Sequence, residues 1–235
     1  MEEKRNIFSK SVLIEILESA LGKTLGEVDK NNVFEKTKLH PKITGIAGDV
    51  IEQSVLGYSA DSYQTPDLYV DGQDIELKTT GIRKSKKRGI NYEAKEPMSI
   101  TAVSPSKIVN ESFENSSFWH KLDKLLLVYY LYDSDTTVTA AEYAQFPIKG
   151  YQFHEFSDED KRILMKDWEL VKAFIEKLQL EYDCPENEYY RLSSELRSKL
   201  MMIDTAPKWP NRPRFRLKRV ALSTIVQKHF GTQLE

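Results

Sequence analysis

The side chains of Asp67, Glu76 and Lys78 fall within one short segment of the chain, residues 66–78. Asp67 precedes one strand-like run, and Glu76 and Lys78 stand two apart in the next. Asp71-Gly72, between the runs, has the composition of a tight β-hairpin turn. Residues two apart in a strand point to the same face, so Glu76 and Lys78 share a face, and the hairpin brings Asp67 beside them. The segment therefore predicts two converging carboxylates with a lysine next to them.

This combination of groups suits one kind of chemistry. Converging carboxylates attract a hard divalent cation such as Mg²⁺. A bound cation lowers the pKa of its water, and a neighbouring lysine can orient or deprotonate that water. These are the parts needed for metal-assisted hydrolysis of a phosphodiester. We therefore expect Mg²⁺ as cofactor, with Asp67 and Glu76 as metal ligands and Lys78 as a catalytic residue.

The spacing Glu-x-Lys is weak evidence when it stands alone. It recurs at Glu2/Lys4, Glu93/Lys95 and Glu159/Lys161, and an isolated copy is more often a solvated ion pair. The copy at Glu76 differs because its neighbours are apolar and a Pro-Asp pair lies at hairpin distance upstream.

A further carboxylate, Glu52, lies in a short segment with helical spacing of apolar residues. That spacing predicts a helix over about residues 50–56, and Gly57 ends it as a C-terminal cap would. Glu52 falls near the apolar side of this helix, where an unpaired carboxylate is costly. Two interpretations remain open: a glutamate on the helix surface, or a further contact to the metal or its water.

The remaining pattern predicts the elements that must position these groups. The run at 124–132 is continuously apolar and bounded by charge, which is typical of a strand buried on both faces. Strands flanked by helices make the expected fold class α/β, with a mixed sheet. Helices are expected at 12–21, from 24, at 158–178 and at 189–202; strands at 98–103 and 124–132; a basic loop at 83–89; and an extended segment followed by a helix over 217–230.

Composition bounds the class of protein. At 235 residues, 40% apolar and 30% charged, the chain is expected to form one globular domain or two closely joined lobes. Cys184 is the single cysteine, which excludes an internal disulfide and favours a cytoplasmic location. No apolar run is long enough for a membrane span, so no membrane partner is expected. The histidines lack zinc-ligand spacing, and there is no glycine-rich phosphate loop.

The distribution of charge, rather than the net charge of −2, indicates a nucleic-acid partner. Two basic segments, 82–89 and 205–219, contain no acidic residue, which suits binding of a phosphate backbone. For the first segment a mobile solvated loop is the alternative; in the second, interleaved prolines and aromatic residues favour a structured loop that presents its cations. The expected DNA-binding residues are Arg83, Lys84, Lys86, Lys87 and Arg88 in the first segment, and Pro207, Lys208, Arg212, Arg214, Arg216 and Lys218 in the second.

Three motifs in order carry a family resemblance. They are Gly48-x-x-x-Glu52-x-x-x-Leu56-Gly57, Pro66-Asp67 and Glu76-Leu77-Lys78-Thr79. Together they resemble the MutH family, which joins the mismatch-repair nicking endonuclease MutH with restriction endonucleases of the Sau3AI type. Segments 22–27, 113–122, 158–169, 215–218 and 229–230 are similar to further parts of that family. The resemblance implies a restriction-endonuclease-like fold of the PD-(D/E)xK type, with two lobes around a DNA cleft.

The resemblance also implies an activity. It is that of a Mg²⁺-dependent type II restriction endonuclease hydrolysing double-stranded DNA at GATC sites. Glu52, Asp67 and Glu76 would hold the metal, with Lys78 and Lys121 as further catalytic residues. Lys121 matches a family lysine near the active site; a basic residue at the entrance to the buried strand is the alternative. The Pro207 to Lys218 loop would read the bases, where Ala206-Pro207-Lys208 replaces the family's Arg-Pro-Lys element.

Two other functions remain open from the sequence. A MutH-type nicking enzyme fits the length, whereas residues 110–118 and the basic insertion at 83–95 look more like the restriction branch. A DNA-binding module without catalysis, such as the allosteric half of such an enzyme, is the second alternative; the intact Asp67, Glu76 and Lys78 set argues against it. Residues 1–235 are expected to be one catalytic domain, or the N-terminal half of a longer restriction enzyme with a C-terminal regulatory domain. Dimerisation on DNA is a further expectation.

Overall fold

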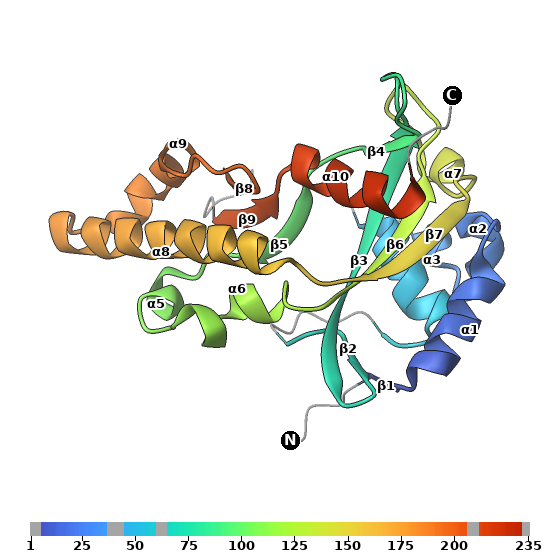
Figure 1. The fold of residues 1–235 in the computed structure, drawn as a ribbon, viewed down its shortest axis with the longest axis horizontal. Coiled ribbons are helices and arrows are strands. Elements are labelled where there is room, and N and C mark those ends of the chain that lie inside the picture. The colour runs from blue at the N-terminus through green and yellow to red at the C-terminus, as the bar shows by residue number, and fades with distance from the viewer. Residues whose placement is uncertain (1–5, 37–44, 60–64, 206–211, 232–235) are drawn as a thin grey trace.

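The strands form two sheets that lie side by side (Figure 1). The computed structural model describes residues 6–36, 45–59, 65–205 and 212–231. The larger sheet has the order β1-β2-β3-β6-β7, with β4 paired to the far end of β3, and the smaller has the order β5-β9-β8. The strands of the larger sheet are β1 (Asn6–Phe8), β2 (Leu68–Val70), β3 (Gln73–Lys84), β4 (Tyr92–Ala94), β6 (Leu125–Leu131) and β7 (Ile148–His154); those of the smaller are β5 (Met98–Ala102), β8 (Met201–Thr205) and β9 (Pro213–Leu217).

Strand β6 is the centre of the larger sheet. It pairs in parallel with β3 and antiparallel with β7, so the sheet is mixed, as expected. Its apolar run is buried on both faces, because each face is covered by its own hydrophobic core. Leu126, Val128 and Tyr130 pack into one core, and Leu125, Leu127 and Tyr129 into the other.

The N-terminal helices cover the first of these faces. Leu13 and Leu17, four residues apart on one side of α1, are fully buried there. Thr24 begins α2 with a capping box in which its side chain and that of Glu27 satisfy each other's backbone N–H groups. The elements on this face are α1 (Lys10–Ala20), α2 (Leu25–Val28), α3 (Val33–Lys36), α4 (Ile46–Val50) and the π-helix η1 (Ile51–Val55).

The second face is covered by α6 (Ser117–His120), α8 (Asp158–Glu181) and α10 (Arg219–Phe230), together with the smaller sheet. Ser157 caps α8 by accepting a hydrogen bond from the Asp160 N–H. The negatively charged residues of the first turn interact favourably with the positive end of the helix dipole. The short elements are α5 (Pro105–Ile108), η2 (Phe113–Asn115), α7 (Ala140–Tyr143), η3 (Pro185–Arg191) and α9 (Leu192–Glu195). None of the helices that the structure describes is long and apolar enough to cross a membrane.

Two predicted segments were wrong in part. The predicted basic loop at 83–89 begins as strand, because β3 continues to Lys84 before turning back into β4. The helix predicted over 189–202 is only a short 3₁₀ and α-helical piece, and Met201 starts strand β8. There Met201 and Ile203 alternate into the core, a strand pattern too short to be distinguished from a helix end by sequence.

Candidate active site

The β2–β3 hairpin forms as the Asp71-Gly72 turn predicts. Asp71 and Gly72 have φ values of 47° and 85°, the pair of positive angles that a type I′ turn needs. Leu68 pairs with Ile75 and Val70 with Gln73. Continuing this register by one residue places Asp67 opposite Glu76.

Asp67 is tied to the hairpin by its own carboxylate. Its Oδ2 atom accepts a hydrogen bond from the Leu77 N–H at 3.0 Å. Burial, and next the charge of Glu76, raise the pKa of the Asp67 carboxyl to about 6, against the lowering influence of Lys78 and Lys121. A carboxyl that shares its site with a second one behaves in this way.

Glu76 is held by two lysines. Its side chain is 1% exposed, and its two oxygens accept from Lys121 Nζ at 3.0 and 2.9 Å. Lys78 Nζ donates to the same carboxylate. A buried carboxylate needs such compensation. The structure thus brings four predicted residues together: Asp67, Glu76, Lys78 and Lys121.

Lys121 comes from the end of α6, 45 residues away from Glu76. It is 8% exposed, and its Nζ also donates to the Thr65 carbonyl at 3.3 Å. Its ammonium group therefore lies between Thr65, which precedes β2, and Glu76 on β3. This contact with Glu76 favours the active-site interpretation of Lys121 over that of a basic residue that only caps the entrance to the buried strand.

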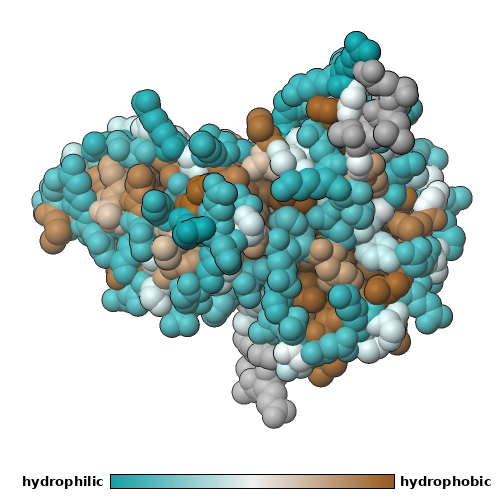
Figure 2. Space-filling view, viewed as in Figure 1, coloured by the Kyte–Doolittle hydropathy of each residue, from teal (hydrophilic) through white to brown (hydrophobic). Residues whose placement is uncertain are grey.

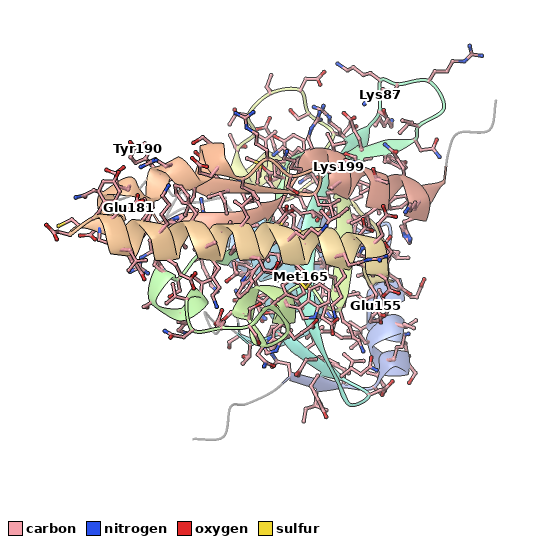
Figure 3. All side chains as sticks on the ribbon, turned by 60° about the vertical axis from the view of Figure 1, so that its left-hand side comes forward. Lys87, Glu155, Met165, Glu181, Tyr190 and Lys199 are labelled. Atoms are coloured by element: carbon pink, nitrogen blue, oxygen red, sulfur yellow. The ribbon has the colours of Figure 1, made fainter. Side chains whose placement is uncertain are left out.

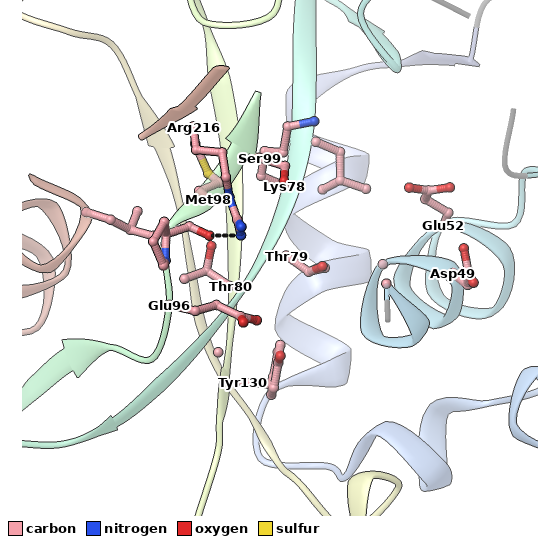
Figure 4. A pocket seen from close by; sticks show the side chains of 16 residues that line it. Asp49, Glu52, Lys78, Thr79, Thr80, Glu96, Met98, Ser99, Tyr130 and Arg216 are labelled. Atoms are coloured by element: carbon pink, nitrogen blue, oxygen red, sulfur yellow. Dashed lines mark hydrogen bonds between the residues drawn. The ribbon is translucent and has the colours of Figure 1, made fainter. Parts of the chain in front are cut away.

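A cleft of about 410 Å³ runs along the part of β3 that lies between its pairings with β2 and β4. Lys78 and Glu52 both line it, from β3 and from η1, and Figure 4 shows their side chains on either side of the same space. The other lining residues that carry polar or aromatic side chains are Asp49, Thr79, Thr80, Glu96, Ser99, Tyr130 and Arg216.

Glu52 lies in a π-helical turn that the sequence did not reveal. The Leu56 N–H bonds to the Ile51 carbonyl, five residues back, and such turns occur frequently at functional sites. The preceding helix lies against β3: a Cβ on Gly48 would be in ordinary contact with Thr79 Oγ1, at 3.4 Å, and with Glu52 Oε1, at 3.9 Å. Glu52 therefore faces the cleft, whereas Asp67 and Glu76 are not among the residues that line this cleft.

The carboxylates are arranged as a pair rather than as a cage. Within the described ranges, no three acidic, histidine or cysteine side chains are close enough together to hold a metal ion by themselves. Mg²⁺ is usually bound through one or two carboxylates, several waters and substrate phosphates. The Asp67–Glu76 pair fits that mode of binding in the kind and number of its oxygen ligands.

The first basic segment forms the tip of the β3–β4 hairpin, which projects from the body of the molecule, and Figure 3 shows Lys87 near its end. Lys84, Lys86, Lys87 and Arg88 are exposed there. Arg83 is different: its guanidinium donates to Glu93 Oε1 at 2.9 and 2.7 Å, and Arg219 approaches the same oxygen at 3.4 Å. Arg83 thus joins β3 to β4 at the base of the hairpin, and Arg219 links the same glutamate to α10.

The second basic segment includes β9, and its described cations are mostly paired. Arg216 donates to Asp204 at 2.9 Å and to the Pro97 carbonyl at 2.7 Å, and Arg214 lies 3.7 Å from Asp204. Lys218 donates to the Ser198 carbonyl. Arg212 is exposed, and Pro207 and Lys208 lie outside the described residues.

Several residues of the site were missed by sequence reasoning. Asp204 and Glu93 neutralise predicted DNA-binding arginines, and Tyr130 and Glu96 line the cleft. Only Glu93 left a usable signal, because the hairpin register pairs it directly with Arg83. The others arrive through contacts between distant segments.

An α/β fold that groups two carboxylates with two lysines, one of which lines a cleft, is typical of a nuclease of the phosphodiester-hydrolysing class. Comparison with known families agrees with this class: the family described as "DNA mismatch repair enzyme MutH" matches residues 56–167. The "Type II restriction enzyme Sau3AI" of Staphylococcus aureus is 28% identical over 156 residues, which are 66% of this chain and 29% of that enzyme. The chain is thus similar to proteins of the MutH/Sau3AI type over its central part.

The mixed sheet flanked by helices confirms the expected α/β fold class, and the similarity to MutH agrees with a restriction-endonuclease-like fold. Both similarities agree with a nuclease. The match spans less than a third of the length of the curated relative. The activity of that whole enzyme therefore comes to this chain only by proposal.

Proposed function

We propose that the protein is a Mg²⁺-dependent endonuclease that cuts double-stranded DNA at GATC sites, in the manner of a type II restriction enzyme. The observation that carries this proposal is the hairpin that sets Asp67 opposite Glu76, with Lys78 and Lys121 on the Glu76 carboxylate. The similarity to proteins of the MutH/Sau3AI type and the cleft along β3 support the same function.

Asp67 and Glu76 would hold the metal, with Glu52 contacting its water shell from the opposite side of the cleft. When bound, Mg²⁺ supplies a water of lowered pKa and neutralises charge that develops on the phosphate. Asp67 offers an oxygen that is not engaged by the Leu77 N–H. The Glu76 oxygens are shared with lysines, so the lysines would also limit the negative charge of the pair before metal binds.

The lysines would position and activate the attacking group. Lys78 lines the cleft and reaches the Glu76 carboxylate, so its ammonium lies between the metal ligands and the space open to DNA. Lys121 fixes Glu76 from the buried side. Lys78 would orient the attacking water, and Lys121 would keep the Glu76 carboxylate oriented.

DNA would enter between the lobes and contact the β3–β4 hairpin. Lys84, Lys86, Lys87 and Arg88 would bind phosphates there, and Arg83 would support the hairpin through Glu93. In the second segment, Arg212 and the Pro207-Lys208 pair would reach the bases, whereas Arg214, Arg216 and Lys218 would bind DNA only by exchanging their present partners.

Cleavage of plasmid DNA tests the proposal and separates it from its alternatives. We expect the chain, with Mg²⁺, to make double-strand cuts at unmethylated GATC, and Asp67→Ala and Lys78→Ala to lose at least about a hundredfold in rate while still binding DNA. Lys177→Ala, on the exposed side of α8, is the matched control. Nicking of hemimethylated sites would instead assign the repair function, and binding without any cleavage would assign the non-catalytic module.

A further inference from the structure

The turn that carries Glu52 is hydrogen-bonded to the segment between α2 and α3. Asn31 donates from its side chain to the Gln53 carbonyl and from its backbone N–H to Ser54 Oγ at 3.1 Å. Ser54 in turn donates to Asp29 Oδ1 at 2.9 Å. We call Asp29, Asn31 and Ser54 the Ser54 clamp.

The geometry of the π-turn explains why it needs external partners. A π-helix bonds each carbonyl to the N–H five residues on, and for Gln53 that donor would be Tyr58. The Tyr58 N–H instead donates to the Glu52 carbonyl at 3.0 Å. The Asn31 amide therefore supplies the Gln53 carbonyl with a donor from another segment.

Asp29 anchors the clamp to the rest of the N-terminal lobe. Its two carboxylate oxygens accept the Val33 and Phe34 N–H groups at 2.9 Å each, which starts α3, and one of them also accepts the Ser54 hydroxyl. Lys36 adds a bond to the Gln53 side chain at 3.0 Å. Ser54 itself is 6% exposed and lies away from the cleft lining.

From this arrangement we infer that the Ser54 clamp is a positioning device for Glu52. The clamp holds the two residues that follow Glu52, neither of which lines the cleft, while Gly48, at the start of the same helical segment, lies next to Thr79 of β3. The direction of the Glu52 carboxylate would thus be set by residues that do not line the cleft. This inference rests on the proposed function, because it presumes that Glu52 contributes to the metal–water shell.

A double-mutant cycle between Ser54→Ala and Glu52→Gln tests the inference. We expect Ser54→Ala to lower kcat about tenfold at saturating DNA, as loss of an outer-shell partner does, with KM for DNA within about twofold. In the Glu52→Gln background the same substitution should lower kcat less than about twofold. Ser54→Thr, which keeps the hydroxyl, should restore most of the rate.

Calorimetric titration of the DNA-free protein with Mg²⁺ supplies a readout independent of cleavage. Ser54→Ala and Glu52→Gln should weaken Mg²⁺ binding by similar factors, and the double variant by no more than Glu52→Gln alone. Ser157→Ala, which removes the cap of α8, is the control for a general loss of stability and should change neither kcat nor Mg²⁺ binding.

The outcomes separate the clamp from the proposed function. Equal losses of kcat from Ser54→Ala in both backgrounds would overturn the inference, as would wild-type kcat and Mg²⁺ binding in Glu52→Gln. A wild-type chain that binds Mg²⁺ but cuts no DNA would refute the proposed function alone, and the calorimetric cycle would then decide the clamp.

Discussion

At the scale of a single residue, folding stability and metal binding place opposite requirements on the protonation of Asp67. Its pKa is raised to about 6 by burial and by Glu76, so the folded protein holds a proton on this carboxyl more tightly than the unfolded chain does. The stability that Asp67 contributes is therefore fully present below pH 4 and is lost as the pH rises through 6. At neutral pH the ionised carboxylate that metal binding requires costs stability.

Asp67→Asn should separate these two demands. In EDTA at pH 7.5 we expect the variant to be more stable than the wild type by about 2 kcal/mol, because a neutral amide is desolvated more cheaply and still accepts the Leu77 N–H. At pH 4 the difference should vanish. Thermal unfolding at the two pH values measures both quantities.

The same substitution should abolish Mg²⁺-dependent cleavage, so stability and activity move in opposite directions. A variant that is less stable than the wild type at pH 7.5 would show that Asp67 is stabilised as a carboxylate by Lys78 and Lys121, contrary to its raised pKa.

The turn of the catalytic hairpin matters at the scale of the element. Gly72 has a φ of 85°, and a Cβ there would meet no atom within 4 Å. The requirement for glycine is therefore one of backbone conformation alone.

Gly72→Ala should lower the free energy of unfolding by about 1 kcal/mol, which is about 2 to 4 °C in melting temperature for a chain of this size. Asp71→Asn should leave stability unchanged, since Asn-Gly suits the same turn. Melting curves of the two variants check this expectation, and an equal loss in both would contradict it.

Elements defined by local patterning were predictable from the sequence. The hairpin, α1, the buried strand β6 and α8 each carry a turn dipeptide, a cap or a periodic apolar face, and all four were found. Strand β8 and the π-turn at Glu52 were not predicted, because pairing with β9 and the bonds from Asn31 define them. Lys121 reached the site as expected only through the family resemblance, since no local signal connects it to Glu76.

The distribution of charge belongs to the whole molecule. Figure 2 shows hydrophilic side chains over most of the visible face, including the projecting β3–β4 hairpin at its top. Sequence alone identified this hairpin as a basic segment. The sequence did not show that Arg83 forms an ion pair with Glu93, nor that Arg214 and Arg216 both pair with Asp204.

Salt dependence of DNA binding tests the role of the hairpin. Each phosphate contact adds about 0.9 to the slope of log affinity against log salt, so Lys86→Ala with Lys87→Ala should reduce that slope by about 2. The rate at saturating DNA should stay unchanged. Lys166→Ala with Lys177→Ala, an equal change of charge on exposed positions of α8, should leave the slope as it is, and a similar reduction there would show that the effect reflects net charge alone.

The contacts around the Glu76 carboxylate have a consequence for the order in which parts of the chain fold. The contact from Asp67 to the second strand spans 10 residues, whereas the Lys121 contact spans 45. Closing the longer loop costs more chain entropy and requires β3 and β6 to find each other in parallel. We therefore expect the acidic pair to form early, as part of a local hairpin, and its second cation to arrive only with the sheet. A chain that has not finished folding would then possess the carboxylates without the lysine that holds them, and competence for catalysis would mark completion of the central sheet.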